Sequence, residues 1–196
     1  MSVWEMIETS ATAAVVCDPR LPDTPIIACN DAFVRLTGYA REEVVGRNCR
    51  FLCGTATEGE GSDQLRQAIV DRQPILVELL NYRKDGTPFR NAVMIAPIFD
   101  AQGQVEYYLG SQMEIAGGTQ DVPPSRRHEA QRQIGLMSKR QCEVLRLMAQ
   151  GNMNKHIAWR LGIGERTVKM HRAELIKALG VRTSADAIRL AVEAGL

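Results

Sequence analysis

The 196-residue chain has no apolar run of the roughly 20 residues that a membrane-spanning helix requires. Its first residues also lack the basic start and apolar stretch of a secretion signal. With 45% hydrophobic residues, its composition is that of a globular protein rather than a disordered chain. We therefore expect a cytoplasmic protein that does not contact a membrane.

The cysteines do not follow the spacing of a zinc site, and their number is odd. The chain has 5 cysteines, at positions 17, 29, 49, 53 and 142. Cys49 and Cys53 lie close in sequence, but no second pair of Cys or His lies nearby. Free thiols in a reducing compartment fit this pattern best, so we expect neither a metal site nor a disulfide framework.

The net charge of the whole chain is only +1 at pH 7, but its two parts differ strongly. Residues 1–120 contain 10 Lys and Arg against 16 Asp and Glu, a net charge of −6. Residues 121–196 contain 14 against 7, a net charge of +7. This asymmetry indicates an acidic domain joined to a basic one, and the basic part can bind nucleic acid, the acidic domain, or each in turn.

A stretch rich in turn formers and poor in apolar residues, 117–125, separates the two parts. We expect an N-terminal cap segment at 1–13, a first domain at 14–116, a linker with a possible helical part at 117–135, and a second domain at 136–196.

Residues 14–116 carry both strand and helix signals. The patterns predict strands at 14–17, 25–28, 75–83, 87–99 and 105–114, and helices at 30–36 and 62–72. Short strands, short helices and then a three-stranded meander form the order of an α+β domain with an antiparallel sheet.

After residue 135 the strand signals stop, which predicts an all-α second domain. Ser138 is a suitable N-cap for a first helix, and further helices are predicted at 154–161, 165–179 and 185–194. Two helices, a tight glycine turn and a basic helix are the sequence form of a helix-turn-helix DNA-binding domain.

The string Gly46-Arg47-Asn48-Cys49-Arg50-Phe51-Leu52 resembles the signature of LOV domains, the blue-light photoreceptor branch of the PAS fold. Further matches precede this string at 30–33 and 36–39, and others follow it at 80–86, 89–91 and 110–112. The resemblance covers about residues 14–115.

This resemblance implies a bound flavin. Amide side chains both donate and accept hydrogen bonds and suit the polar edge of its ring: Asn81 and Asn91 would read that edge, and Asn48 and Gln112 would complete the polar side. Arg50 and Arg66 would pair with the phosphate. The apolar walls are expected to come from Val15, Ile26, Leu52, Leu80, Val93 and Leu109. Because the chain lacks a glycine-rich dinucleotide fingerprint, FMN fits better than FAD.

In LOV domains, blue light drives a bond between the cysteine sulfur and flavin carbon C4a, and the bond breaks again in the dark. The resemblance implies this photochemistry, rather than catalytic turnover, for Cys49. Gln112 would sense the change at flavin N5 and pass it through its strand to the outer surface of the sheet. Cys53 replaces the Gln of many LOV domains, which removes an amide contact and adds a thiol near Cys49.

Residues 136–196 resemble the LuxR-type helix-turn-helix of bacterial transcription factors, through the motifs at 138–141, 143–145, 154–158, 161–163 and 167–172. His156 replaces a frequent Glu and makes this surface more basic. The expected contacts to DNA are Lys155, Thr167, Lys169, Met170 and Arg172. In this family the last helix commonly forms the dimer surface, here through Ile188, Ala191 and Val192.

The combined hypothesis is a blue-light-regulated transcription factor that is not an enzyme. In the dark the sheet would cover the dimer helix of a monomer. The adduct at Cys49 would release the helix-turn-helix domain, which then forms a homodimer on double-stranded DNA. The alternatives are a constitutive or small-ligand- or redox-sensing PAS regulator, and an FMN redox enzyme, for which no catalytic acid–base pair is apparent.

Overall fold

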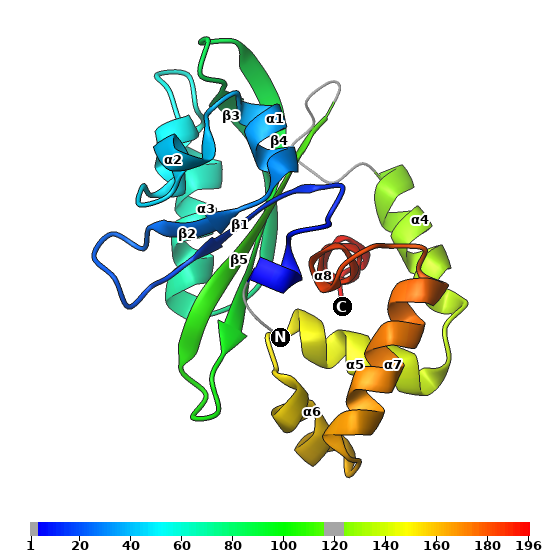
Figure 1. Cartoon of the computed structure of the whole chain (residues 1–196). Coiled ribbons are helices and arrows are strands. Elements are labelled where there is room, and N and C mark those ends of the chain that lie inside the picture. Colours follow the sequence, from blue (N-terminus) through cyan, green and yellow to red (C-terminus); the bar gives the residue numbers. More distant parts are fainter. Residues whose placement is uncertain (1–3, 116–123) are drawn as a thin grey trace.

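The computed structural model describes residues 4–115 and 124–196, which form a five-stranded antiparallel sheet with short helices followed by a helical domain (Figure 1). The strands lie in the order β2-β1-β5-β4-β3. Their bounds are Ala13–Cys17 (β1), Ile26–Cys29 (β2), Ile75–Tyr82 (β3), Pro88–Phe99 (β4) and Val105–Glu114 (β5). The α+β expectation for the first domain is thus confirmed.

Short helices between β2 and β3 cover one face of the sheet, here named the inner face. They are α1 (Asp31–Thr37), α2 (Arg41–Val44), the 3-10 helix η2 (Cys49–Leu52) and α3 (Gly59–Asp71), and a further 3-10 helix, η1 (Trp4–Met6), precedes β1. Asn30 caps α1, because its Oδ1 accepts a hydrogen bond from the Phe33 backbone N–H at 3.0 Å. Of these helices, the sequence pattern predicted only α1 and α3, because α2 and η2 are too short to show a helical period.

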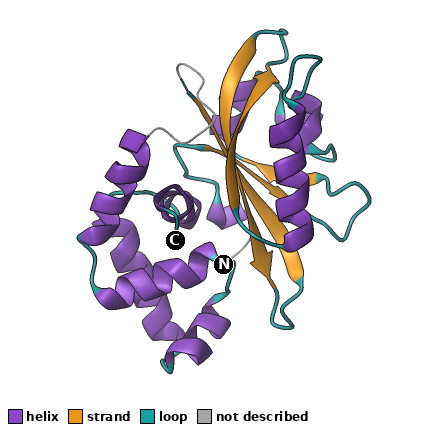
Figure 2. Ribbon diagram, turned by 180° about the vertical axis from the view of Figure 1, so that it is seen from behind, coloured by secondary structure: helices purple, strands orange, loops and turns teal. Residues whose placement is uncertain are grey.

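The helical domain packs against the opposite face of the sheet, the outer face (Figure 2). Its helices are α4 (Pro124–Gly135), α5 (Lys139–Ala149), α6 (Asn154–Leu161), α7 (Glu165–Ala178) and α8 (Ser184–Ala194). Capping boxes start α5 at Ser138 and α8 at Thr183. Of the predicted linker, residues 117–123 lie outside the described residues, and the rest forms α4.

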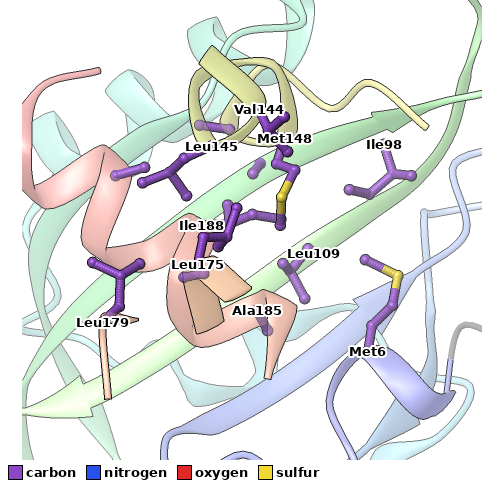
Figure 3. Packing of buried hydrophobic residues seen from close by; sticks show 14 of the residues in the cluster. Met6, Ile98, Leu109, Val144, Leu145, Met148, Leu175, Leu179, Ala185 and Ile188 are labelled. Atoms are coloured by element: carbon purple, nitrogen blue, oxygen red, sulfur yellow. The ribbon is translucent and has the colours of Figure 1, made fainter. Parts of the chain in front are cut away.

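Strand alternation gives the sheet two buried faces. On β1, Val15 and Cys17 pack under the short helices of the inner face, whereas Ala14 and Val16 belong to a cluster shared with the helical domain. This shared core joins sheet residues such as Leu109 to helical residues such as Leu175 (Figure 3). The two domains are therefore packed as one body, with α8 held between the sheet and α4, α5 and α7.

Among the described residues, no helix is both long and apolar enough to span a bilayer.

A backbone contact also ties the domains together. The Phe99 N–H at the end of β4 donates to the Gly151 carbonyl at 3.0 Å, just after α5. Gly151 has a left-handed φ of 78°, and a Cβ there would clash with the Pro97 carbonyl oxygen and stand 2.9 Å from the Phe99 ring. Glycine is thus required both by the backbone conformation and by the close approach of the sheet.

We expect Gly151→Ala to lower the free energy of unfolding by more than Gly180→Ala, measured by urea unfolding. Gly180 has a similar φ of 67° but open space around it, so its alanine variant loses only the roughly 1–2 kcal/mol of left-handed strain. The alanine at 151 must also push the sheet away, which small-angle scattering would detect as a larger radius of gyration. Equal losses of stability and unchanged radii in both variants would contradict this role for Gly151.

Candidate functional site

Three buried amides meet on the inner face, one from each of the strands β3, β4 and β5. Asn91 donates through Nδ2 to Asn81 Oδ1 at 2.8 Å and to Gln112 Oε1 at 3.0 Å. Asn91 is fully buried, and the other two side chains are each 3% exposed. The sequence-based grouping of these three residues therefore matches their positions in the structure.

One atom of this amide cluster has no hydrogen-bond partner within the protein. Asn91 Oδ1 is buried and accepts no hydrogen bond. Leaving a buried acceptor unpaired costs about 1–3 kcal/mol, and a donor on a bound group would remove this cost. An N–H on the edge of a polar ring would meet this requirement.

Cys49 lies at the start of η2 and packs against the inner-face cluster that contains Cys17 and Leu52. A hydrogen bond with Cys17 and burial together raise the pKa of the Cys49 thiol well above its usual value. The sulfur therefore keeps its proton at neutral pH. The sequence analysis did not single out Cys17, although its place on β1, two residues beyond Val15, puts it on the inner face.

Asn48 serves the local backbone. Its Oδ1 accepts from the Arg50 N–H at 3.0 Å and caps η2, while its Nδ2 donates to the Asp23 carbonyl at 2.6 Å. The turn that presents Cys49 is thereby fixed at its first residue.

Cys53 directly follows η2 and lies beside the amide cluster. The Asn81 Nδ2 donates to Cys53 Sγ at 4.0 Å, and burial raises the pKa of the Cys53 thiol. The contact from the end of η2 to the cluster is therefore made by the Cys53 thiol, where the resemblance to LOV domains leads us to expect the amide of a Gln.

Four of the six predicted wall residues lie on the inner face. Val15, Ile26 and Leu52 belong to one buried cluster, and Val93 to a neighbouring one under α3.

The predictions for Leu80 and Leu109 are wrong, because both side chains lie on the outer face. Leu80 pairs with Arg90, and Leu109 pairs with Val16 and belongs to the core shared with the helical domain. Leu79 lies on the inner face instead. Strand alternation counted from Asn81 would have found it.

The two arginines predicted to bind phosphate are exposed, and both are paired with carboxylates. Arg50 donates to Asp23 at 2.7 Å, and Arg66 pairs with Asp63 one turn earlier on α3. Both guanidinium groups are thus positioned at the surface, where an anionic tail would compete with these carboxylates. The set of buried amides, thiol and exposed arginines fits a polar ring with a phosphate tail.

The second candidate site is the exposed face of α7 and the start of α6. Lys155 and Lys169 are exposed, Met170 is 50% exposed and Thr167 is half-buried. Val168 and Leu175 are buried and anchor α7 in the helical domain.

Arg172, the fifth expected DNA contact, faces the interior of the helical domain instead of solvent. It is half-buried, donates to Asn154 Oδ1 at 2.5 Å and to Ser184 Oγ at 2.8 Å, and its pKa is lowered by burial. Its role in this arrangement is to join α7 to the first residues of α6 and α8.

The predicted dimer surface is covered within the chain. Ile188 and Ala191 are buried, at 2% and 0% exposure, and Val192 is half-buried. Because α8 contacts the sheet, these residues are not available to a second copy in this arrangement.

Comparison with known proteins agrees with this geometry. The model of the PAS domain family matches residues 12–116, and that of the bacterial regulatory proteins of the luxR family matches residues 136–191. Blue-light-activated histidine kinase 1 of Erythrobacter litoralis (strain HTCC2594) is 47% identical over 130 residues, 66% of this chain and 35% of the kinase. Phototropin-2 of Oryza sativa subsp. japonica is 44% identical over 112 residues, 57% of this chain and 12% of the phototropin.

Among solved structures, the dark structure of the blue-light photoreceptor Aureochrome1 LOV is similar with a TM-score of 0.55 and 37% identity, covering 59% of this chain and 84% of that one. The chain spans about a third or less of the length of the two curated relatives. The chain belongs to the PAS domain family, in its LOV-like form, and joins that domain to a LuxR-family helix-turn-helix domain in a LOV–HTH architecture.

Proposed function

We propose that this protein is a transcription regulator whose binding to double-stranded DNA is switched by blue light through bound FMN. The observation that carries the proposal is the use of one sheet for two purposes. Its inner face holds the amide cluster and Cys49, and its outer face covers α8, the predicted dimer helix.

When bound, FMN supplies the absorption of blue light and an electrophilic ring carbon. Asn81, Asn91 and Gln112 orient the ring edge, and Arg50 and Arg66 exchange their carboxylate partners for its phosphate. The Cys49 thiol stays protonated in the dark, because its pKa is raised. With FMN bound, the Cys49 thiol would supply the sulfur for a reversible bond to the ring carbon, and its proton would pass to the ring.

Transfer of this proton to the ring would change the hydrogen-bonding character of the ring atom that Gln112 faces. An acceptor atom on the ring would become a donor, and the Gln112 amide would then present its oxygen instead of its nitrogen. Asn91, on the neighbouring strand, donates to Gln112 Oε1 at 3.0 Å, so a rearrangement of the Gln112 amide would also change this hydrogen bond. Two strands of the sheet therefore respond together.

The output is release of the helical domain. A shift of a few kcal/mol between closed and open forms is enough to invert their populations. In the open form Ile188, Ala191 and Val192 leave the closed core and meet a second copy, so that two α7 helices bind paired half-sites. The protein is then a monomer in the dark and a homodimer when lit or bound to DNA.

The first test is an absorption spectrum before and after a blue flash. We expect structured flavin absorption that bleaches in the light and recovers in the dark. Cys49→Ala should keep the absorption and lose the bleaching, because the sulfur is missing, whereas Cys142→Ala in the helical domain should behave like the wild type. Bleaching in Cys49→Ala would exclude the adduct, and a protein still colourless after added FMN would favour a regulator that senses another small ligand.

The second test is DNA affinity measured by fluorescence anisotropy over a range of salt concentrations. Lys169→Ala should weaken binding and reduce the slope of log affinity against log salt by about 0.9 per protomer, because one phosphate contact is lost. Lys177→Ala, an equal change of charge at the other end of α7, should leave the slope unchanged. Equal effects of the two variants would argue against insertion of the N-terminal half of α7 into the groove.

A further inference from the structure

A charged side chain lies inside the contact between the two domains. Arg189, on α8, is 3% exposed in the described structure. Its Nε donates to Glu193 Oε1 at 2.8 Å, one turn further along the same helix, and the Glu193 side chain is 9% exposed. Such a buried ion pair is favourable only while further hydrogen bonds compensate its loss of water.

The compensating contacts come from the outer face of the sheet. Arg189 Nη1 donates to Ser111 Oγ on β5 at 3.1 Å and makes a longer contact of 3.5 Å to the Ala92 carbonyl oxygen on β4. Each of these residues is the direct neighbour of an amide of the inner face. Ser111 precedes Gln112, and Ala92 follows Asn91.

This placement connects the two faces of the sheet. Because consecutive strand residues point to opposite sides, a backbone shift that moves Gln112 also moves Ser111. The apolar contacts around α8 are non-directional and tolerate a small slide, whereas a hydrogen bond to a buried guanidinium weakens steeply with distance and angle. Arg189 is therefore the contact most sensitive to a displacement of β5.

A second polar contact lies on the same side of α8. Ser10, which precedes β1 and is 6% exposed, donates through Oγ to Asp186 Oδ1 at 2.5 Å. Asp186, Arg189 and Glu193 follow each other at intervals of three and four residues, so they form one stripe on the helix. All three would regain hydration when α8 leaves the sheet, which favours a separable contact over a permanent one.

We propose that Arg189 is the positioning residue that holds α8 on the sheet and converts a shift of β4 and β5 into release of the helical domain. This inference rests on the proposed light response for its second half only. Its first half, the hold on α8, concerns the dark protein and is testable without light.

The dark test is a double-mutant cycle read by hydrogen–deuterium exchange at the α8 and β5 amides of the full chain. One variant is Ser111→Ala, and the other is Arg189→Met combined with Glu193→Gln, so that no unpaired carboxylate stays buried. If the contact holds the domains, Ser111→Ala should raise exchange about fivefold or more in the wild-type background and have little effect in the other. A similar increase in both backgrounds would overturn the proposal.

Two controls separate this role from a general loss of stability. Arg189→Lys, which keeps the charge, should exchange more slowly in α8 than Arg189→Met combined with Glu193→Gln. Lys177→Met removes an exposed charge from α7 and should leave α8 unchanged. An equal effect of the Lys and Met variants at position 189 would show that the charge has no part in the contact.

The light test uses Ser111→Ala and compares bleaching with exchange. The variant should bleach as fully as the wild type, yet show a smaller light-induced rise in α8 exchange. A rise equal to that of the wild type would overturn the transmission step. Absence of bleaching in the wild type would instead overturn the photoreceptor proposal, and the dark cycle would still decide whether Arg189 holds α8 on the sheet.

Discussion

The alternation of side chains along β4 and β5 is the constraint on which the rest of the structure depends. The middle of each strand is buried on both faces, so successive residues there face alternately the inner-face cores and amide cluster or the contact with the helical domain. Ser111 and Gln112 are adjacent in sequence and face opposite compartments. A single layer of sheet thus lies between the candidate ligand site and the DNA-binding domain. A change at one face can reach the other through one strand.

The sequence predicted the local features well. Cap residues such as Ser138, turn glycines and apolar periods are local signals, and the strands and long helices were found from them. The predictions for Leu80 and Leu109 chose the wrong face of the strand, because neighbouring residues on a strand point to opposite faces. Because both faces are buried here, apolar content alone does not distinguish them.

The helical domain gives a different kind of error. Arg172 lies on α7 among basic and polar residues, and its position in the helical repeat is compatible with the outward face. Its partners Asn154 and Ser184 come from two other helices, whose approach is fixed by tertiary packing. Arg189 was missed for the same reason, because a charged residue in an amphipathic helix reads as solvated until a second domain covers it.

The opposite net charges of the two parts explain less of their contact than the sequence suggests. The contact itself is made mainly by apolar side chains, together with a few polar contacts from Arg189, Ser10, His156 and the Gly151 carbonyl. Exposed charges more than about 8 Å apart are largely screened at physiological salt. In the proposed light response, the charge difference would act on the encounter of separated domains, whereas apolar burial would hold the closed form together.

The shared core has a consequence for the solubility of the separated form. In the proposed open form, the outer face of the sheet would present Ala14, Val16, Met94, Ala96 and Leu109 to water. A flat apolar surface of this kind promotes aggregation unless it is covered again. The acidic excess of the first domain would make such open molecules repel one another, so the charge of this domain would oppose their aggregation while the sheet is uncovered.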